Sequence, residues 1–345
     1  MIFSKYESLE QFRASKTLRF GDDPVVLLEK IHGANAQFYL TTDPSVHDSG
    51  FEGVPFTAPE EDRTIDGTTH PAVNIVFGKR TNWVLDKENF FNHTPVVKSY
   101  LGRMTHLYTL IRSWKGGETR PCVRVFGEIY GGLYKKTTSP GCKKIQNDTA
   151  YCPHNDFAVF DIIVDDVVLH WDVVKDLCQT AHIHTTPEIA RDQLSTILKS
   201  FDVESLMTRV PMELHGLEDP NSPAEGVVIK SLAAKPTKDQ LIGMKLKQTR
   251  MLERPTKKVR CTEVPDYGLY SGYMNQNRFD CYRSKVGDEA IMNRRQMGVH
   301  LKALVTDAVQ SIMGDYEDIE PEVLKGIRKV MTPIAKKMIM DFDVE

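Results

Sequence analysis

The chain has 345 residues, of which 41% are hydrophobic, so it can bury a large core and is long enough for two domains. Its formal net charge of -3 excludes binding to nucleic acid by bulk positive charge alone, while leaving room for a local basic groove. No apolar run is long enough to cross a bilayer, and Met1–Tyr6 lack a signal-peptide pattern.

Short apolar segments separated by turn residues predict a mixed α and β domain over residues 1–250. We expect strands at 25–28, 73–77, 123–130, 157–164, 225–230 and 241–246. Residues 41–72 are rich in Asp, Glu, Gly, Pro and Thr, so we expect a long surface loop there. The helical spacing of apolar residues predicts a helix within 186–208.

The sequence changes character near residue 250. Residues 245–260 are rich in lysine and arginine and contain Pro255, which predicts a hinge or linker that binds phosphate or nucleic acid. A solvated charged surface is the alternative for this stretch. Apolar stripes with helical spacing follow in 301–312 and 321–338, so we expect an all-helical domain over 251–345.

The cysteines are scattered along the chain without a Cys-x-x-Cys pair, which predicts reduced thiols in an intracellular protein. Cys142, Cys152 and His154 stand near one another in sequence. No fourth ligand follows at a spacing usual for zinc, so the sequence does not predict a zinc site there.

Lys30 directly follows an apolar segment and precedes Gly33 by three positions. A lysine at the end of a buried strand can be held desolvated, and a glycine in the next turn lets a nucleotide phosphate approach its amine. Such an amine can attack the α-phosphate of ATP and carry AMP as a phosphoramidate. A surface lysine beside a turn glycine is the commoner alternative, so the interpretation depends on the motifs downstream.

Carboxylates interrupt two of the predicted strands. Glu128 lies in an apolar run, where a buried glutamate needs a partner such as a ribose hydroxyl or a nearby lysine. Strict alternation puts Phe160 and Asp161 on opposite faces of their strand. Phe160 would stack on adenine or fill the core, and Asp161 would orient the reactive lysine, orient a metal or cap a turn.

Charged residues at strand ends complete a candidate phosphate site. Arg80 follows a predicted strand and has the forked geometry that binds phosphate, with an exposed Lys-Arg pair at a strand end as the alternative. Glu225 stands at the mouth of an apolar strand, which suits a hard cation such as Mg²⁺ or a simple turn. Lys245 and Lys247 alternate onto one strand face, where a phosphate would relieve their repulsion. Lysines that protect an edge strand are the alternative.

The order of these motifs resembles that of the lysine-adenylating nucleotidyltransferases, the superfamily of ATP-dependent DNA ligases, RNA ligases and mRNA capping enzymes. Lys30–Gly33 matches the nucleophile motif, and later motifs match at 126–128, 159–161, 225–230 and 245–247. The segment 29–35, EKIHGAN, is most similar to the RNA ligase 2 branch of phage and kinetoplastid editing ligases, in which threonine usually replaces Ala34. The helical tail also resembles this branch, because DNA ligases and capping enzymes carry an OB-fold there.

The resemblance implies an α+β fold, with an N-terminal adenylyltransferase domain of antiparallel sheets and helices and a small C-terminal all-helical domain. It implies an ATP-dependent RNA ligase that seals 3′-hydroxyl and 5′-phosphate ends, in nicked duplex or bridged RNA, through lysyl-AMP and RNA-adenylate intermediates. The implied cofactors are ATP and Mg²⁺ or Mn²⁺, and the implied partner is RNA. We expect a monomer that acts in RNA repair in the cytoplasm, which is the host cytoplasm if a phage encodes it.

The resemblance also assigns roles to individual residues. Lys30 is the implied catalytic nucleophile and Glu225 the implied metal ligand. The implied cofactor-binding residues are Glu29, Ile31, Asn35, Arg80, Glu128, Phe160, Glu225, Lys245 and Lys247. The residues assigned to RNA are His32, Asp161 and Arg278.

Two alternatives of other kinds share parts of this pattern. A DNA ligase or a capping-type nucleotidyltransferase has the same lysine motifs, and a capping enzyme would be labelled by GTP instead of ATP. A non-catalytic RNA-binding protein with a decayed nucleotide pocket would bind RNA without forming an adduct.

Overall fold

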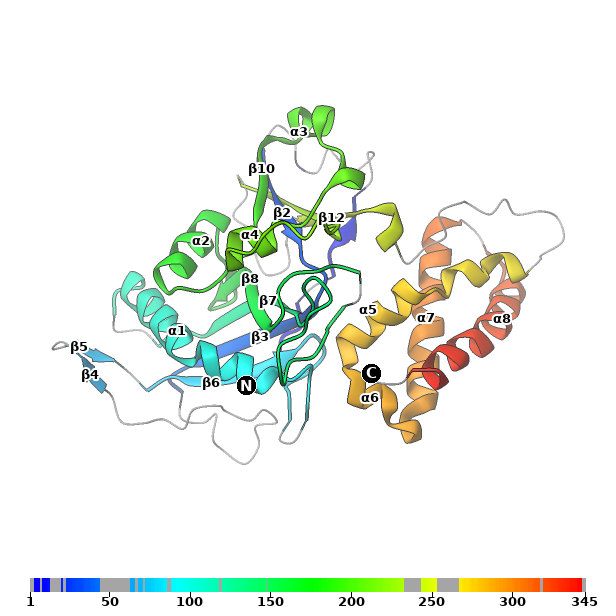
Figure 1. The fold of residues 1–345 in the computed structure, drawn as a ribbon, viewed down its shortest axis with the longest axis horizontal. Coiled ribbons are helices and arrows are strands. Elements are labelled where there is room, and N and C mark those ends of the chain that lie inside the picture. The colour runs from blue at the N-terminus through cyan, green and yellow to red at the C-terminus, as the bar shows by residue number, and fades with distance from the viewer. Residues whose placement is uncertain are drawn as a thin grey trace. The chain divides into compact units, whose positions relative to one another are not determined.

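The computed structural model describes residues 3–6, 8–12, 20, 23–43, 63–65, 68–70, 72–85, 88–117, 120–146, 148–232, 243–252, 267–316 and 319–342. The chain divides into two compact units, Met1–Lys247 and Gln248–Glu345. The first unit is built on β-sheets and the second on helices, as Figure 1 shows. This α+β class is the one predicted from the sequence.

The first unit contains two five-stranded sheets. The first sheet has the order β1 (Glu10–Gln11), β12 (Gly243–Lys247), β11 (Gly226–Ser231), β2 (Pro24–Lys30), β10 (Glu188–Gln193). The second sheet has the order β6 (Asn74–Lys79), β3 (Ala34–Thr41), β7 (Val123–Gly131), β8 (Asn155–Val164), β9 (Val167–Val168). All neighbouring strands are antiparallel except β1 and β12. The predicted strands coincide with β2, β6, β7, β8, β11 and β12.

Helices cover one face of the second sheet, and the other face carries both polar side chains and small buried apolar clusters, such as that of Tyr39, Val76 and Trp83. The long helix α1 (His93–Trp114) and the helix α2 (Trp171–Thr180) pack against this sheet. Alternation along β3 points Ala36 and Phe38 into this core. Asn35 therefore points to the opposite face.

The elements between α2 and β11 differ from the prediction. Residues 186–208 were expected to form a helix, but Glu188–Gln193 is the strand β10, which pairs with β2. Only α3 (Leu194–Ser200) and the 3-10 turn η3 (Val203–Ser205) are helical, and α4 (Val210–His215) follows. The open edge of β2 offers backbone hydrogen bonds to this segment, and local spacing cannot report that long-range pairing.

The expected loop over 41–72 is also not entirely loop. β3 runs into it through Thr41, and β4 (Arg63–Ile65) and β5 (Thr68–His70) form a hairpin inside it. Of the predicted hinge over 245–260, residues 253–260 lie outside the described residues, and residues 245–252 include the end of β12 (Gly243–Lys247) and η4 (Thr249–Met251).

The second unit is helical, as predicted. It contains the 3-10 segments η4 (Thr249–Met251), η5 (Tyr267–Tyr273) and η6 (Arg294–Gln296), and the helices α5 (Gln276–Val286), α6 (Asp288–Met292), α7 (Met297–Asp315) and α8 (Pro321–Met340). Apolar stripes of α7 and α8 form its core, and Pro321 opens α8. Within the described ranges, no helix is long and apolar enough to cross a membrane.

Candidate active site

Lys30 lies where the chain passes from the first sheet to the second. It is the last residue of β2, and β3 begins at Ala34 after a short turn. In the first sheet, Gly226 is the register partner of both Lys30 and Lys247, so the two lysines flank one glycine across three adjacent strands. Residues directly opposite in neighbouring strands share a face, so both amines project to the same side.

Glu225 joins the two amines. Its Oε2 lies 2.6 Å from Nζ of Lys30, and its Oε1 lies 2.7 Å from Nζ of Lys247. Burial alone would raise the pKa of this carboxyl, but the ammonium groups of Lys247 and Lys30 outweigh it and hold the pKa below its usual range. Gly226 has φ +153°, and a Cβ there would lie 2.1 Å from the carbonyl oxygen of Leu246, so only glycine lets β11 begin this close to β12.

The turn after Lys30 is held against β7 and the loop before β8. The backbone N–H of His32 donates to the hydroxyl of Tyr151 at 2.6 Å, and Nε2 of Gln146 donates to the carbonyl of Gly33 at 3.2 Å. A Cβ on Gly33 would lie 2.2 Å from the carbonyl oxygen of Ile129. From the sequence, this glycine was expected to let a phosphate approach Lys30. In the structure, the absence of a side chain at Gly33 instead lets the turn pack closely against β7.

Glu29 and Ile31, on either side of Lys30, use their side chains to anchor this region. The Glu29 carboxylate accepts hydrogen bonds from Oγ1 of Thr208 at 2.5 Å and from the backbone N–H of Arg209 at 2.8 Å. Ile31 packs in a buried cluster that includes Tyr151. Neither side chain is placed beside the Lys30 amine, so the predicted nucleotide contacts of these two residues receive no support from their side chains.

Burial raises the pKa of Glu29 to about 7, only partly offset by the hydrogen bond from Thr208. Because the folded-state pKa lies above the ordinary value of 4.5, stability is greatest in acid and falls as the pH rises from about 4.5 to 7. We expect Glu29→Gln to remove up to about 3 kcal/mol of this pH dependence. Urea unfolding of both proteins at pH 5 and 8 measures it, and parallel pH profiles would contradict the prediction.

Asn35 and Glu128 are the candidate site residues on β3 and β7 of the second sheet. They are direct partners across β3 and β7 and therefore lie on one face. Burial raises the pKa of Glu128 to about 7, against the lowering effect of the nearby charges of Lys30 and Arg80. Nη2 of Arg80 donates to Oγ of Ser8 at 2.6 Å. Two predicted cations and the predicted ribose-binding carboxylate are thus neighbours in space.

A β-bulge changes the prediction for Phe160 and Asp161. The register between β7 and β8 shifts so that Phe126 faces Asp161 and Gly127 faces Val159, which leaves Phe160 as the extra residue. The ring of Tyr6 lies 4.9 Å from that of Phe160, and the Tyr6 hydroxyl donates to Asp161 at 2.5 Å. The two side chains therefore meet the same tyrosine, and their predicted placement on opposite faces is wrong.

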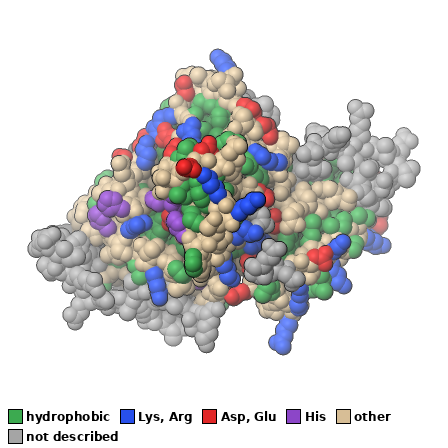
Figure 2. All heavy atoms as spheres, in the orientation of Figure 1, with side chains coloured by type: hydrophobic (Ala, Val, Ile, Leu, Met, Phe, Trp, Pro, Cys, Tyr) green, Lys and Arg blue, Asp and Glu red, His purple; other side chains and the backbone are tan. Residues whose placement is uncertain are grey.

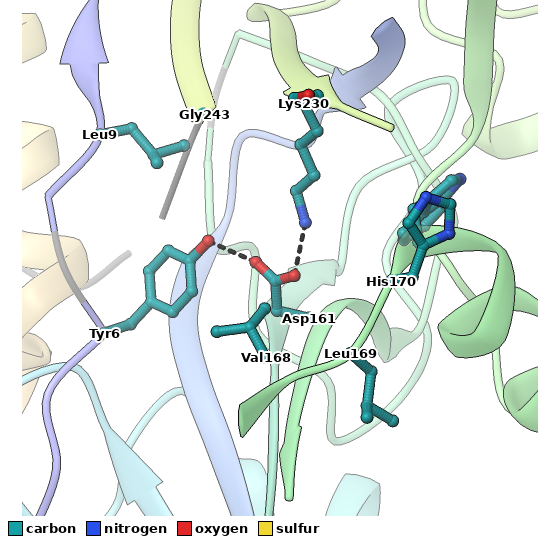
Figure 3. Close-up of a pocket in the computed structure, with 10 residues that line it drawn as sticks. Tyr6, Leu9, Asp161, Val168, Leu169, His170, Lys230 and Gly243 are labelled. Atoms are coloured by element: carbon teal, nitrogen blue, oxygen red, sulfur yellow. Dashed lines mark hydrogen bonds and ion pairs between the residues drawn. The ribbon is translucent and has the colours of Figure 1, made fainter. Parts of the chain in front are cut away.

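Asp161 links three parts of the first unit, as Figure 3 shows. Its Oδ1 accepts from Nζ of Lys230 on β11 at 2.7 Å, and its Oδ2 accepts from the hydroxyl of Tyr6. Lys230 also donates to the carbonyl of Phe160 at 2.5 Å. The small cavity beside these groups, about 30 Å³, has room for about one water molecule. In this structure Asp161 serves to tie the two sheets together.

His32 and Lys245 lie close to the central ion pairs. Nδ1 of His32 is buried without a hydrogen-bond partner among the described residues. Burial lowers the pKa of His32, against the charge of Glu225, so its ring is neutral at pH 7. Lys245 is the register partner of Val228 and lies two residues before Lys247 on β12. The two lysine side chains therefore project from the same face of that strand.

Arg278 lies in the second unit and is buried. Its guanidinium donates to the carbonyl of Tyr273 at 2.6 Å and to Oγ of Ser311 at 2.9 Å, and it forms an ion pair with Asp307. This network holds η5 and α5 to α7. A buried, paired guanidinium is not placed to reach an RNA backbone, so the structure does not support the RNA contact predicted for Arg278.

Sequence reasoning missed several residues that hold the site. Lys230 lies inside the motif at 225–230, so a buried carboxylate partner for it, which the structure shows to be Asp161, could have been predicted. Tyr6, Gln146, Tyr151 and Thr208 carry no local signal, because their contacts join segments far apart in the chain.

Figure 2 shows lysine and arginine side chains interleaved with acidic ones on the visible face of the first unit, without a single basic stripe. In this unit, ion pairs of 2.6 and 2.7 Å join Glu225 to Lys30 and Lys247.

The chain is similar to solved structures of Naegleria gruberi RNA ligase. A variant with AMP and Mn has 15% identity and a TM-score of 0.43, over 72% of this chain and 57% of that chain. The enzyme with PPi has 15% identity and a TM-score of 0.40, over 73% and 57%. This chain thus spans a little over half the length of those proteins, and similarity at this level carries no argument about function.

No curated protein matches the chain. A model of the RNA ligase family, in contrast, matches residues 23–247, which include both lysines, Glu225 and almost all of the described strands. The match covers well over half of the sequence and agrees with the resemblance drawn from the motifs. The chain therefore belongs to the RNA ligase family.

Proposed function

We propose that the protein is an ATP-dependent RNA ligase in which Lys30 is the nucleophile. The observation that carries the proposal is the buried carboxylate of Glu225 between the amines of Lys30 and Lys247. Two ammonium groups that converge on one anion form a site in which a phosphate can replace or join that anion. Membership of the RNA ligase family supports RNA as the substrate.

In the first step, the free amine of Lys30 attacks the α-phosphorus of ATP. An N–P bond forms, the bond to the bridging oxygen breaks, and pyrophosphate leaves with the bonding electrons. The Lys30–Glu225 ion pair has to open, and the ammonium has to lose a proton, before the attack. Glu225 is a weak base because its pKa is held low, so its role is to position Lys30 and Lys247.

The residues around Lys30 fit the remainder of a nucleotide. Arg80, Lys245 and Lys247 supply cations for the phosphates, and Nδ1 of His32 is a buried polar atom available to a phosphate oxygen. Glu128 and Asn35 lie together where a ribose hydroxyl would need a carboxylate and an amide. Phe160 would meet adenine, with Tyr6 against its ring.

A divalent metal also fits this set. Glu225 stays ionised through the physiological range, and a carboxylate oxygen is the hard donor that Mg²⁺ and Mn²⁺ prefer. Glu225 would be the protein ligand of a bound cation, which would neutralise charge on the phosphate oxygens.

Two further steps complete the proposed reaction. AMP passes from Lys30 to the 5′-phosphate of an RNA end, which frees the lysine and forms a pyrophosphate link. A 3′-hydroxyl then attacks the activated 5′-phosphate and expels AMP, so that the two ends are joined. We propose nicked duplex or bridged RNA as the substrate, a monomer as the active form and RNA repair in the cytoplasm as the setting.

Lys30→Ala should abolish adduct formation, because it removes the proposed nucleophile. The other amine that pairs with Glu225, that of Lys247, lies on a different strand. The measurement is incubation with Mg²⁺ and ATP labelled at the α-phosphate, followed by a denaturing gel. Lys199→Ala, which changes an exposed lysine on α3, is the matched control and should label as the wild type does. Label retained by Lys30→Ala would exclude Lys30 as the nucleophile.

The same gel separates the alternatives. Labelling by GTP instead of ATP would indicate a capping enzyme. Binding of RNA without any label, in protein freed of bound AMP, would indicate an RNA-binding protein with an inactive pocket. Joining of nicked DNA in preference to nicked RNA would indicate a DNA ligase.

A further inference from the structure

Four side chains with metal-binding atoms lie around His215, the last residue of α4. Cys152, His154 and Asp156 come from the start of β8 and the loop before it. His184 comes from the loop between α2 and β10. None of these residues takes part in the proposed adenylation chemistry.

The spacing of these atoms is close to that of a metal site. The donor atoms of Cys152, His154 and His215 all lie within 4.8 Å of one another. Those of Asp156, His184 and His215 meet the same limit. A tetrahedral zinc ion with N and S ligands holds its donor atoms about 3.3–3.8 Å apart, so shifts of about 1 Å or rotamer changes would close either set around an ion.

The protein alone leaves this cluster poorly satisfied. The rings of His154 and His184 lie 5.0 and 5.5 Å from that of His215, edge to face. Nδ1 of His184 is buried and lies 3.2 Å from the carboxylate of Asp156, which is its ion-pair partner when the ring is protonated. The thiol of Cys152 donates a weak hydrogen bond to the carbonyl of His154 at 3.1 Å.

We propose that Cys152, His154 and His215 bind a zinc ion. A thiolate with two imidazoles favours Zn²⁺ over the Mg²⁺ that a phosphate site would take. Nε2 of His215 lies 2.9 Å from the hydroxyl of Tyr130 and 4.0 Å from Asp156, polar partners of the kind found behind metal-bound histidines. Asp156 and His184 would be polar neighbours of the zinc-binding side chains. A water molecule would occupy the fourth coordination position of the ion.

A zinc ion at this site would lie near the surface and would stabilise the segments that support the turn after Lys30. His154 is exposed, so one ligand of the proposed site lies at the surface. Cys152 follows Tyr151, which holds the His32 backbone, and α4 follows Thr208 and Arg209, which hold Glu29. A zinc ion between them would fix both supports of the Lys30 turn.

The sequence alone does not predict this zinc site, because no fourth ligand follows Cys142, Cys152 and His154 at a usual spacing. The structure replaces Cys142 in that set with His215, which lies far along the chain. Cys142 is therefore a suitable control, since it is a free cysteine close in sequence and outside the cluster.

The test is zinc binding itself, which does not depend on ligase activity. Full-length protein, stripped with a chelator and titrated with Zn²⁺ against a competing indicator, should bind about one ion per chain. Cys152→Ser and His215→Ala should each weaken binding by tenfold or more, because each removes a ligand. Cys142→Ser and His182→Asn, the latter an exposed histidine outside the cluster, should bind as the wild type does.

A second measurement, with Co²⁺ in place of Zn²⁺, tests the proposal on the wild type itself and therefore does not depend on whether a variant folds. Co²⁺ added to the stripped wild type should give a thiolate charge-transfer band, which Cys142→Ser keeps and Cys152→Ser loses. Zinc should also raise the melting temperature of the stripped wild type. Absence of the band in the wild type, or equal zinc affinity in Cys152→Ser and Cys142→Ser, would overturn the proposal.

Discussion

Replacing Glu225 with glutamine should slow adenylation of Lys30 by about 10²-fold or more and lower the free energy of unfolding by about 3–5 kcal/mol. The side chains of Glu225 and Lys247 are 3% and 7% exposed, so removal of the negative charge leaves a buried ammonium without its anion. The amide also turns an N–H donor toward one of the two amines. Label transfer from ATP and urea unfolding measure the two effects.

Glu218→Gln is the matched control for this prediction. Glu218 pairs with Lys135 at 2.5 Å but is exposed, so the same chemical change there should leave both adduct formation and unfolding nearly unaltered. Equal effects of the two substitutions would contradict the role given to Glu225.

The pH dependence of the Glu225 effect has a definite sign. The folded-state pKa lies below the ordinary value of 4.5, so the stability that this ion pair supplies is present above that value and is lost as the pH falls. The stability difference between wild type and Glu225→Gln should therefore shrink in acid. A difference that grows in acid would contradict the ion-pair account.

The charged ends of the strands could be predicted because local sequence determines them. Lys30, Glu225 and Lys247 each stand next to a short apolar run, and such runs form strands wherever a core is available. Their meeting at Gly226 required the sheet order, which no local pattern contains. The family resemblance assigned these residues to one site without giving the sheet order.

The errors have the same physical origin. The spacing in 186–208 is compatible with a helix, but the free edge of β2 takes Glu188–Gln193 as a strand. The bulge at Phe160 breaks the period of two on which its predicted face depended. His215 could not be joined to Cys152 and His154, since ligand spacing rules apply only to neighbours in sequence.

Asp161→Asn should lower the free energy of unfolding by about 3 kcal/mol while the folded protein still forms the Lys30 adduct. Asp161 is 5% exposed, and it is the anion for Lys230, which is 13% exposed. Loss of that charge leaves the Lys230 ammonium between the two sheets without its ion-pair partner and weakens the hydrogen bond from Tyr6. Urea unfolding and the labelling gel measure the two quantities on the same samples.

The control is Asp166→Asn, because Asp166 pairs with Arg124 at 2.8 Å but is 60% exposed. That change should cost no more than about 1 kcal/mol, and Asn tolerates the left-handed backbone at this position, where φ is +64°. The comparison separates the two roles considered for Asp161. A stability loss at Asp161 with unchanged RNA affinity makes it a link between the sheets, whereas unchanged stability with weaker RNA binding would restore the RNA contact predicted from the sequence.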